Sequence, residues 1–183
     1  MATDTDLLAK ARAGDRGAFD ELVGRHRENV RRFAAVMADA ETDDLVAEAV
    51  AVAWRDLPRF EGRSAFSTWL YGIALNLCRH ALRDKGRHAE TVEPSAMDAR
   101  AARHGVLSSI YRRELVERMG FAIGRLPVSM REAFVLRYVE KLEYDEISAI
   151  TGASPGATRV RAHRAKLLMK GELGAVVDTF WLE

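Results

Sequence analysis

The segment Leu142–Arg159 reads LEYDEISAITGASPGATR and decides the fold of the carboxyl-terminal half of the chain. It has the order of a helix, a tight turn and a second helix. Ser148 is small enough to let two helices cross closely, Gly152 can supply the turn, and Ser154 can cap the next helix. Pro155 suits a first helical position, where its missing N–H leaves no hydrogen bond unmade. The segment therefore predicts a helix-turn-helix whose second helix begins at Pro155.

The second helix of this motif is basic. Between Ile147 and Gly171 the sequence contains no Asp or Glu, while five Lys or Arg residues fall there. An acid-free helix can enter a DNA major groove, where arginine bridges guanine O6 and N7 and lysine meets phosphate. The alternative is an amphipathic helix whose basic face is only solvated. We expect DNA binding, because turn, cap and charge pattern occur together. The early turns present Arg159, Val160, Arg161, His163, Arg164 and Lys166.

Helical periodicity also dominates outside this motif, and no stretch shows the sustained alternation typical of β-strands. Helices are predicted over residues 4–12 and 16–38 and over Thr42–Leu57, ahead of a proline. Ser64 can cap the helix that follows. The chain is therefore predicted to be all-α.

Two helical regions are separated by a stretch that lacks a core pattern. Residues 86–110 carry charged, small and turn-forming residues and few large apolar ones, which is typical of a flexible linker. In the region that follows, Ser129 and Glu132 have the spacing of a capping box and would open a helix. The sequence predicts two small helical domains, over residues 1–85 and 111–183, joined by this linker.

Charge is distributed unevenly although the 183 residues sum to a net charge of only +1. From Phe33 to Trp54 there is no Lys or Arg, whereas Asp39, Glu41, Asp43, Asp44 and Glu48 all fall there. This acidic block favours contact with a cationic partner, and the small net charge argues against indiscriminate coating of nucleic acid.

Several classes of protein are excluded by composition. No run approaches the about 18 apolar residues that span a bilayer, and the start lacks a signal peptide, so we expect a soluble cytoplasmic protein without membrane insertion. Cys78 is the single cysteine, which excludes an internal disulfide and a multi-cysteine zinc site. The histidines show no metal-ligand spacing, and neither a phosphate-binding loop nor a serine nucleophile motif occurs. We expect no catalytic residues, no metal and no cofactor.

Both halves together resemble the extracytoplasmic-function (group 4) sigma factors of bacterial RNA polymerase, in the sigma-70 family. The order of the matching stretches makes the resemblance specific, and it covers nearly the whole chain. The stretches are residues 43–54, 59–71, 73–76, 126–127, 131–138, 144–147 and 161–166. Four positions depart from the family pattern: Ala47 stands where the family commonly has Gln, Val50 where it often has an aromatic residue, Glu143 where it has a Ser or Thr cap, and Thr158 where it has a branched apolar residue.

The resemblance implies a function for each region. Residues 1–85 would dock on the β′ clamp helices of core polymerase and open promoter DNA at the minus-ten element. Residues 111–183 would read the minus-thirty-five element and contact the β flap, ending in an apolar tail over residues 176–182. An anti-sigma factor is the implied regulator, and catalysis would belong to the polymerase.

The resemblance also implies three sets of site residues, carried over by position. The polymerase-binding set is Asp43, Asp44, Leu45 and Glu48. The minus-ten set, with a pocket for a flipped base in the loop from Phe60 to Ser67, is Phe60, Gly62, Arg63, Ser64, Ser67, Thr68, Asn76, Arg79 and Arg83. The minus-thirty-five set is Ser154, Arg159, Val160, Arg161, His163, Arg164 and Lys166.

Two rival interpretations remain open from the residues alone. A stand-alone helix-turn-helix regulator would bind palindromic duplex by itself, whereas a sigma factor would bind weakly alone and become promoter-specific only with core polymerase. A helical adaptor that never touches DNA would leave the acid-free helix unexplained.

Overall fold

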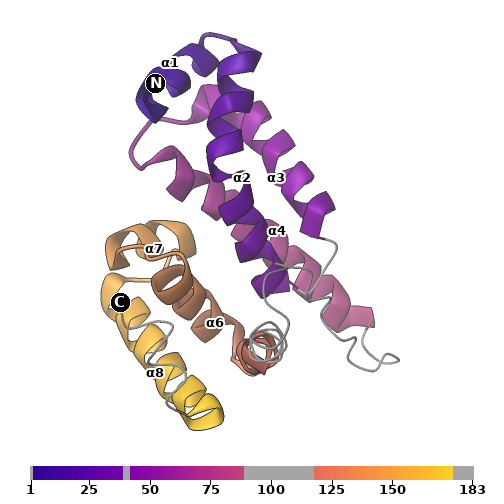
Figure 1. Cartoon of the computed structure of the whole chain (residues 1–183), viewed down its shortest axis with the longest axis vertical. Coiled ribbons are helices and arrows are strands. Elements are labelled where there is room, and N and C mark those ends of the chain that lie inside the picture. The colour runs from indigo at the N-terminus through magenta and orange to yellow at the C-terminus, as the bar shows by residue number, and fades with distance from the viewer. Residues whose placement is uncertain (1, 39–41, 89–117, 175–183) are drawn as a thin grey trace, which may run out of the picture.

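Every regular element that the structure describes is a helix (Figure 1). The structure is a computed structural model, and it describes residues 2–38, 42–88 and 118–174. The amino-terminal region comprises α1 (Asp4–Arg12), α2 (Arg16–Ala38), α3 (Thr42–Asp56), a 3-10 turn (Leu57–Arg59) and α4 (Phe66–His88). The carboxyl-terminal region comprises a helix over residues 118–125, α6 (Val128–Phe134), a π-helical turn (Val135–Val139), α7 (Tyr144–Thr151) and α8 (Pro155–Leu173).

The predicted all-α class is confirmed within these ranges. Most of the predicted linker and the whole apolar tail over residues 176–182 lie outside the described residues. The helix α4 runs to His88, so the first three residues assigned to the linker are helical.

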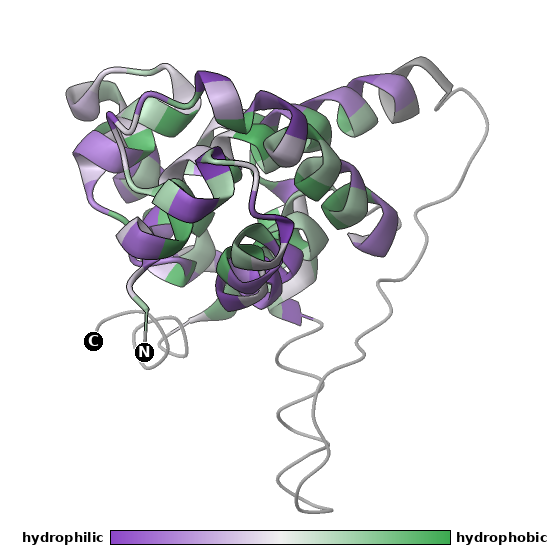
Figure 2. Cartoon of the chain, turned by 90° about the horizontal axis from the view of Figure 1, so that it is seen from above, coloured by the Kyte–Doolittle hydropathy of each residue, from purple (hydrophilic) through white to green (hydrophobic). Residues whose placement is uncertain are grey.

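The amino-terminal region packs α1, α3 and α4 against the long helix α2. Its centre is aromatic: Phe19 and Phe33 are fully buried, and Phe33 lies edge-on to Tyr71 with ring centroids 5.4 Å apart. Trp54 of α3 is partly buried and packs on Phe19, with ring centroids 5.0 Å apart, at the edge of this core. Figure 2 shows that the more hydrophobic stretches of the helices lie mainly toward the inside of the fold and the more hydrophilic stretches mainly toward the outside. Burial of these large side chains is the main stabilising contribution.

The carboxyl-terminal region folds around Phe134, Leu136, Ile147 and Met169, all with no exposed area. Its closest helix pair is α6 with α8. The core-facing residues of α8 include Ala162 and Ala165, whose small side chains let the backbones of α6 and α8 approach closely. This close packing of α6 on α8 fixes the orientation of the outer face of α8 relative to the rest of the carboxyl-terminal region.

Two predicted helix caps are wrong. Ser64 does not cap α4, because its hydroxyl donates to the carbonyl of Ala65 and the helix begins at Phe66. The capping box at Ser129 is also absent, because α6 begins at Val128, two residues before the predicted start, directly after Pro127. The carbonyl of Pro127 accepts hydrogen bonds from the backbone N–H groups of Met130 and Arg131. The Glu132 side chain pairs with Arg79 of α4.

The two regions pack against each other along one side of α4. The helix α7 lies on α4, and the π-helical turn touches α2 (Figure 1). The helix α8 lies on the far side of α7 and α6, turned away from the amino-terminal region.

Candidate nucleic-acid interfaces

The helix-turn-helix predicted from the sequence is formed. Gly152 ends α7 in the left-handed conformation, at φ 75°, and its N–H donates to the carbonyl of Ser148 at 2.9 Å. Ser154 caps α8, accepting from the N–H of Ala157 at 3.2 Å. Ser148 was expected only to let the two helices cross closely, but its hydroxyl also donates a hydrogen bond to the carbonyl of Ala153 at 2.6 Å. The turn is thus fixed by hydrogen bonds at both of its ends.

The start of α7 is held by Glu146 in place of a Ser or Thr cap. The backbone N–H of Glu143 donates to Oε2 of Glu146 at 2.9 Å. A carboxylate in the first turn also lies beside the positive end of the helix dipole. The substitution of Glu at position 143 therefore leaves the helix start well formed.

The outer face of α8 presents the predicted minus-thirty-five residues to solvent. Of these, Arg161 and Lys166 are half-buried. The others are exposed: Ser154, Arg159, Val160, His163 and Arg164. The opposite face is buried against the core and includes Thr158, whose hydroxyl oxygen lacks a hydrogen-bond partner within the described part of the chain.

Two tyrosines, which sequence reasoning did not identify, position basic side chains of this helix. The guanidinium of Arg159 lies 5.0 Å from the ring centre of Tyr144, and Arg137 lies 4.9 Å from the same ring. The ammonium of Lys166 lies 5.5 Å from the ring centre of Tyr138. These cation–π contacts restrain two cations at the base of the exposed face. Tyr144 opens α7 and Tyr138 lies inside the π-helical turn, and nothing in the local sequence pairs either ring with a cation of α8.

The loop before α4 forms a hollow with an aromatic floor. Phe60 is 5% exposed and stacks on Trp69 with ring centroids 4.7 Å apart. The hollow has a volume of about 210 Å³, and its lining residues are Arg59, Phe60, Glu61, Arg63, Ser64 and Trp69. Gly62 takes a positive φ of 73° at its edge, where a side chain would strain the backbone. The predicted pocket loop is therefore concave and partly polar.

A second hollow lies where α4 meets α7. Its volume is about 240 Å³. From α4 and the loop before it the lining includes Thr68, Trp69 and Asn76, and from α7 it includes Ala149 and Ile150. The face of α4 predicted to contact DNA is thus turned toward the carboxyl-terminal region. On α4 Asn76 and Arg83 are exposed and Ser67 is half-buried, as is Ser64 in the loop before the helix.

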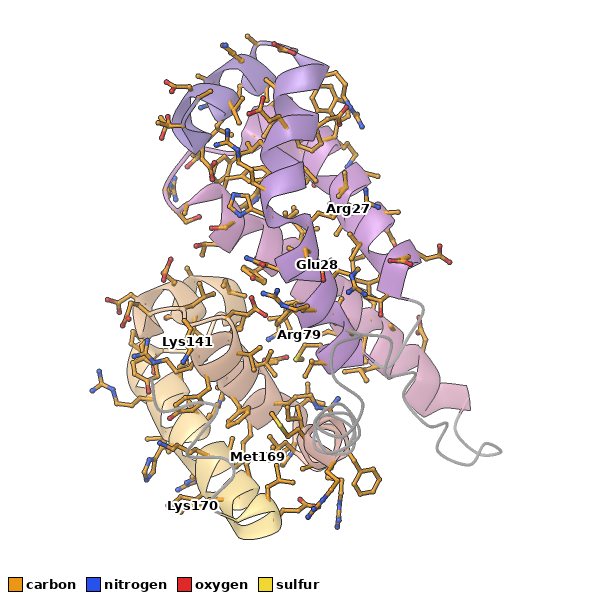
Figure 3. The ribbon with its side chains drawn as sticks, in the orientation of Figure 1. Arg27, Glu28, Arg79, Lys141, Met169 and Lys170 are labelled. Atoms are coloured by element: carbon orange, nitrogen blue, oxygen red, sulfur yellow. The ribbon has the colours of Figure 1, made fainter. Side chains whose placement is uncertain are left out.

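Arg79 is half-buried at the interface between the two regions, where α4 faces α6 and α7; this interface is called the seam below. The Nε and Nη2 of Arg79 donate to the two carboxylate oxygens of Glu132 at 2.7 and 2.8 Å, and the carbonyl of Thr151 lies 3.4 Å from Nη2. Glu132 is 3% exposed. Hydrogen bonding to this carboxylate raises the pKa of Arg79 above its usual range. Figure 3 shows Arg79 between α4 and the carboxyl-terminal region.

Two further contacts cross the same seam. Thr68 is 2% exposed, and its hydroxyl donates to Oε1 of Glu146 at 3.2 Å. The hydroxyl of Tyr71 donates to a carboxylate oxygen of Glu140. Burial raises the pKa of Glu140, an effect opposed by this hydrogen bond, and burial also raises the pKa of Tyr71. In this conformation Thr68 is therefore buried and the guanidinium of the half-buried Arg79 is paired with Glu132, which sequence reasoning did not anticipate.

The acidic block includes an exposed surface at the start of α3. Asp43 and Asp44 lie in the first turn of this helix and are exposed, as is Glu48 one turn later. Leu45, predicted in the same set, is only 7% exposed and packs in the core. The structure thus separates the acidic side chains, which face solvent, from the leucine between them.

The described residues carry no sign of a metal site or of a membrane span. Within residues 2–38, 42–88 and 118–174, no group of three or more His, Cys, Asp or Glu side chains could hold a metal ion. None of the helices in those ranges is long and apolar enough to cross a bilayer. Cys78 is fully buried in α4, and burial raises the pKa of its thiol to about 12.

Comparison with protein families gives two matches that follow each other along the chain. Residues 22–88 match the model of sigma-70 region 2, and residues 117–169 match that of sigma-70 region 4. The ECF RNA polymerase sigma-E factor of Escherichia coli strain K12 is 33% identical over 176 residues, covering 90% of this chain and 91% of that protein. The protein of the same name from Haemophilus influenzae is 29% identical and covers 93% of this chain and 95% of its own length.

Solved structures show a similar arrangement. CnrH in complex with the cytosolic domain of CnrY has a TM-score of 0.70 at 26% identity, covering 94% of this chain and 97% of that one. The sigma factor RpoE of Bartonella quintana, solved with the anti-sigma factor NepR, has a TM-score of 0.72 at 24% identity and supports the fold. It covers 85% of this chain and 96% of its own.

Proposed function

The chain belongs to the extracytoplasmic-function sigma factors of the sigma-70 family, which are transcription initiation factors and not enzymes, and we propose how its surfaces do this work. It binds bacterial core RNA polymerase and directs it to specific promoters. The observation that carries the proposal is the acid-free outer face of α8, behind a Ser154 cap, in a chain that matches both regions of the family. The protein would act in the cytoplasm, where its polymerase and promoters are.

The minus-thirty-five element is read by α8 in the major groove. Arg159 and Arg164 are exposed on the outer face and have the bidentate geometry that suits guanine edges. His163 and Val160 lie between them and could contact base edges or thymine methyl groups. Lys166 stands farther along the helix, restrained by Tyr138, and is suited to a phosphate.

The minus-ten element is read as a single strand at the loop and α4. The hollow floored by Phe60 and Trp69 has the concave, partly aromatic character that holds an extruded base. Extrusion costs a few kcal/mol of stacking, which polymerase contacts would offset. Gly62 lets the strand approach the backbone closely, and the exposed Asn76 and Arg83 continue the path along α4.

Core polymerase is bound at two places in this proposal. Asp43, Asp44 and Glu48 form an exposed acidic surface on α3 that suits the β′ clamp helices. The carboxyl-terminal region would contact the β flap. Leu45 is not included, because it is buried in the core.

An anti-sigma factor is the proposed regulator. A structure similar to this one, CnrH, was solved with the cytosolic domain of CnrY, and RpoE of Bartonella quintana with an anti-sigma factor. We expect a partner of that class to hold this chain away from core polymerase.

The test is promoter-directed transcription with purified components. Core polymerase is incubated with genomic fragments with and without the protein, and the RNA ends are sequenced. New defined start sites with shared upstream elements would establish the proposed function and reveal both promoter elements. If core polymerase gained no start sites while the protein alone bound palindromic duplex, a stand-alone regulator would replace the proposal.

A further inference from the structure

The last turns of α8 expose two leucines that the core of the region does not use. Leu167 is 55% exposed and Leu168 is 53% exposed, although the buried side of the same helix packs against α6. These turns lie at the edge of the molecule, away from the amino-terminal region (Figure 1). Large apolar side chains that gather on one exposed surface mark a contact site. The two leucines therefore indicate a contact that the described residues do not make.

Gly171 extends this apolar strip toward the end of the helix. It follows Leu167 by four residues and Leu168 by three, so the three residues share one surface of α8. A side chain at position 171 would meet no atom within 4 Å in the described part of the chain. Glycine lowers helix stability relative to alanine, and no neighbour among the described residues requires it here. A backbone that crosses the helix closely at this point would account for the glycine.

We propose that residues 176–182 of the same chain fold back and pack across Leu167, Leu168 and Gly171. This tail segment is mostly apolar, and its apolar residues are Val176, Val177, Phe180, Trp181 and Leu182. Burial of such side chains against the leucines removes apolar area of both surfaces from water. None of the covered residues is assigned to DNA or to polymerase, so the inference goes beyond the proposed function.

The chain leaves the axis of α8 directly before this segment. Gly174 ends the helix with φ 67° and ψ −153°, a conformation that essentially only glycine adopts, and its N–H donates to the carbonyl of Lys170 at 2.9 Å. Leu167 lies about 10 Å back along the helix from Gly174. Residues 175–182 span up to about 26 Å when extended. The segment is therefore long enough to turn at Gly174 and reach both leucines.

Charge favours the tail over a second copy of the chain as the occupant. The sequence has no Asp or Glu from Pro155 to Gly171, where α8 carries five Lys or Arg residues, whereas the tail carries Asp178. A tail that lies along α8 brings this carboxylate toward a cationic helix. Two copies that met through Leu167 and Leu168 would instead bring their basic helices together, and like charges would oppose that contact.

The first arm of the test follows Trp181 in the full chain. The protein is labelled with fluorinated tryptophan, which gives fluorine signals from three tryptophans, and Trp181→Phe identifies the signal of Trp181. A soluble nitroxide speeds the relaxation of exposed labels and spares covered ones. Burial of one large apolar side chain favours the packed state by about tenfold or more, so Trp181 should be largely shielded in the otherwise unchanged chain.

The double variant Leu167→Gln with Leu168→Gln removes the apolar strip while keeping residues that form helices well. It should raise the nitroxide relaxation of Trp181 several-fold. The matched control is Phe121→Gln with Val128→Gln, which replaces two other exposed apolar side chains, both outside α8. The control should leave Trp181 shielded. A urea melt of each variant checks that the carboxyl-terminal region stays folded.

Gly171→Leu tests the close approach of the tail. The substitution makes the strip more hydrophobic but fills the space that the tail backbone needs, so it should release Trp181 as the double variant does. Trp181 that stays shielded in Gly171→Leu would overturn the crossing at Gly171. Equal shielding of Trp181 in the unchanged chain and the double variant, or equal release in the control, would overturn the contact with the leucines.

The second arm distinguishes the tail from other occupants of the strip. Sedimentation equilibrium over a wide range of concentrations should give the mass of one chain, 20.4 kDa, and the shielding of Trp181 should not depend on concentration. Shielding that grows with concentration as the mass doubles would assign the strip to a second copy. Shielding that arises only when core polymerase is added would assign it to the polymerase. Either result would overturn the intramolecular contact.

Discussion

Neutralising the two aspartates at the start of α3 tests the proposed polymerase-docking surface, through the double variant Asp43→Asn with Asp44→Asn. Both side chains are exposed in the first helical turn. There each carboxylate stabilises the helix by about 0.3–1 kcal/mol, so the pair contributes about 0.6–2 kcal/mol to the free energy of unfolding. Hydrogen bonds to a charged group are worth about 1.5–3 kcal/mol each, so loss of two at an interface costs about 3–6 kcal/mol. Affinity for core polymerase should therefore fall by about 100-fold or more while the protein stays folded.

The assay pairs a binding titration with a urea melt of the same samples. The control is Asp20→Asn with Glu21→Gln, which removes two exposed charges from α2, where they pair with Arg16 and Arg25. Asn is preferable to Lys at the start of α3, because a cation there would oppose the helix dipole. A loss of affinity below about threefold, or an equal loss in the control, would refute the docking assignment.

Three further predictions follow from individual side chains. Arg161→Ala with Arg164→Ala should lower run-off transcription from a promoter that depends on its minus-thirty-five element by about tenfold or more, since one bidentate base contact discriminates by about 1–3 kcal/mol; unchanged output would remove both residues from the reading set. Cys78 should resist thiol reagents at pH 8 until the protein is unfolded, because burial raises its pKa to about 12, and fast labelling of the native protein would contradict its burial. Burial raises the pKa of Glu140 from 4.5, so the folded state retains this proton to higher pH. Urea melts of the wild type relative to Glu140→Gln should therefore show a stability difference that falls as pH rises through the raised pKa, and a difference that rises instead would show that the carboxylate is favourably paired with Tyr71.

Local signals in the sequence predicted most of the fold and the outer face of α8. Gly152 and Ser154 act through their nearest neighbours, so their roles could be inferred from residue type and spacing alone. The family resemblance, which depends on the order of motifs, is confirmed by the two family matches. The burial of Leu45 could also have been predicted from the sequence, since Leu45 shares helical spacing with the buried Ala49 and Ala53.

The seam between the two regions could not be predicted from local signals in the sequence. Arg79 and Glu132 are 53 residues apart, and each had a plausible local role, as a DNA contact and as part of a capping box. Periodicity identifies the polar face of a helix but not what lies on it. The pairing therefore depends on tertiary structure, and it joins a residue predicted to belong to a cap with a residue predicted to contact DNA.

The stacking of Arg159 on Tyr144 has a consequence for how quickly and tightly the recognition helix engages DNA. A free arginine explores many rotamers and loses them on binding, at a cost of about 0.5–1.5 kcal/mol for a long side chain. With its guanidinium held 5.0 Å from an aromatic ring, Arg159 has already given up part of that freedom in the unbound protein. If Arg159 contacts DNA as proposed, Tyr144 would lower the entropic penalty of recognition without contacting a base, and promoter strength would depend on a residue outside the reading surface.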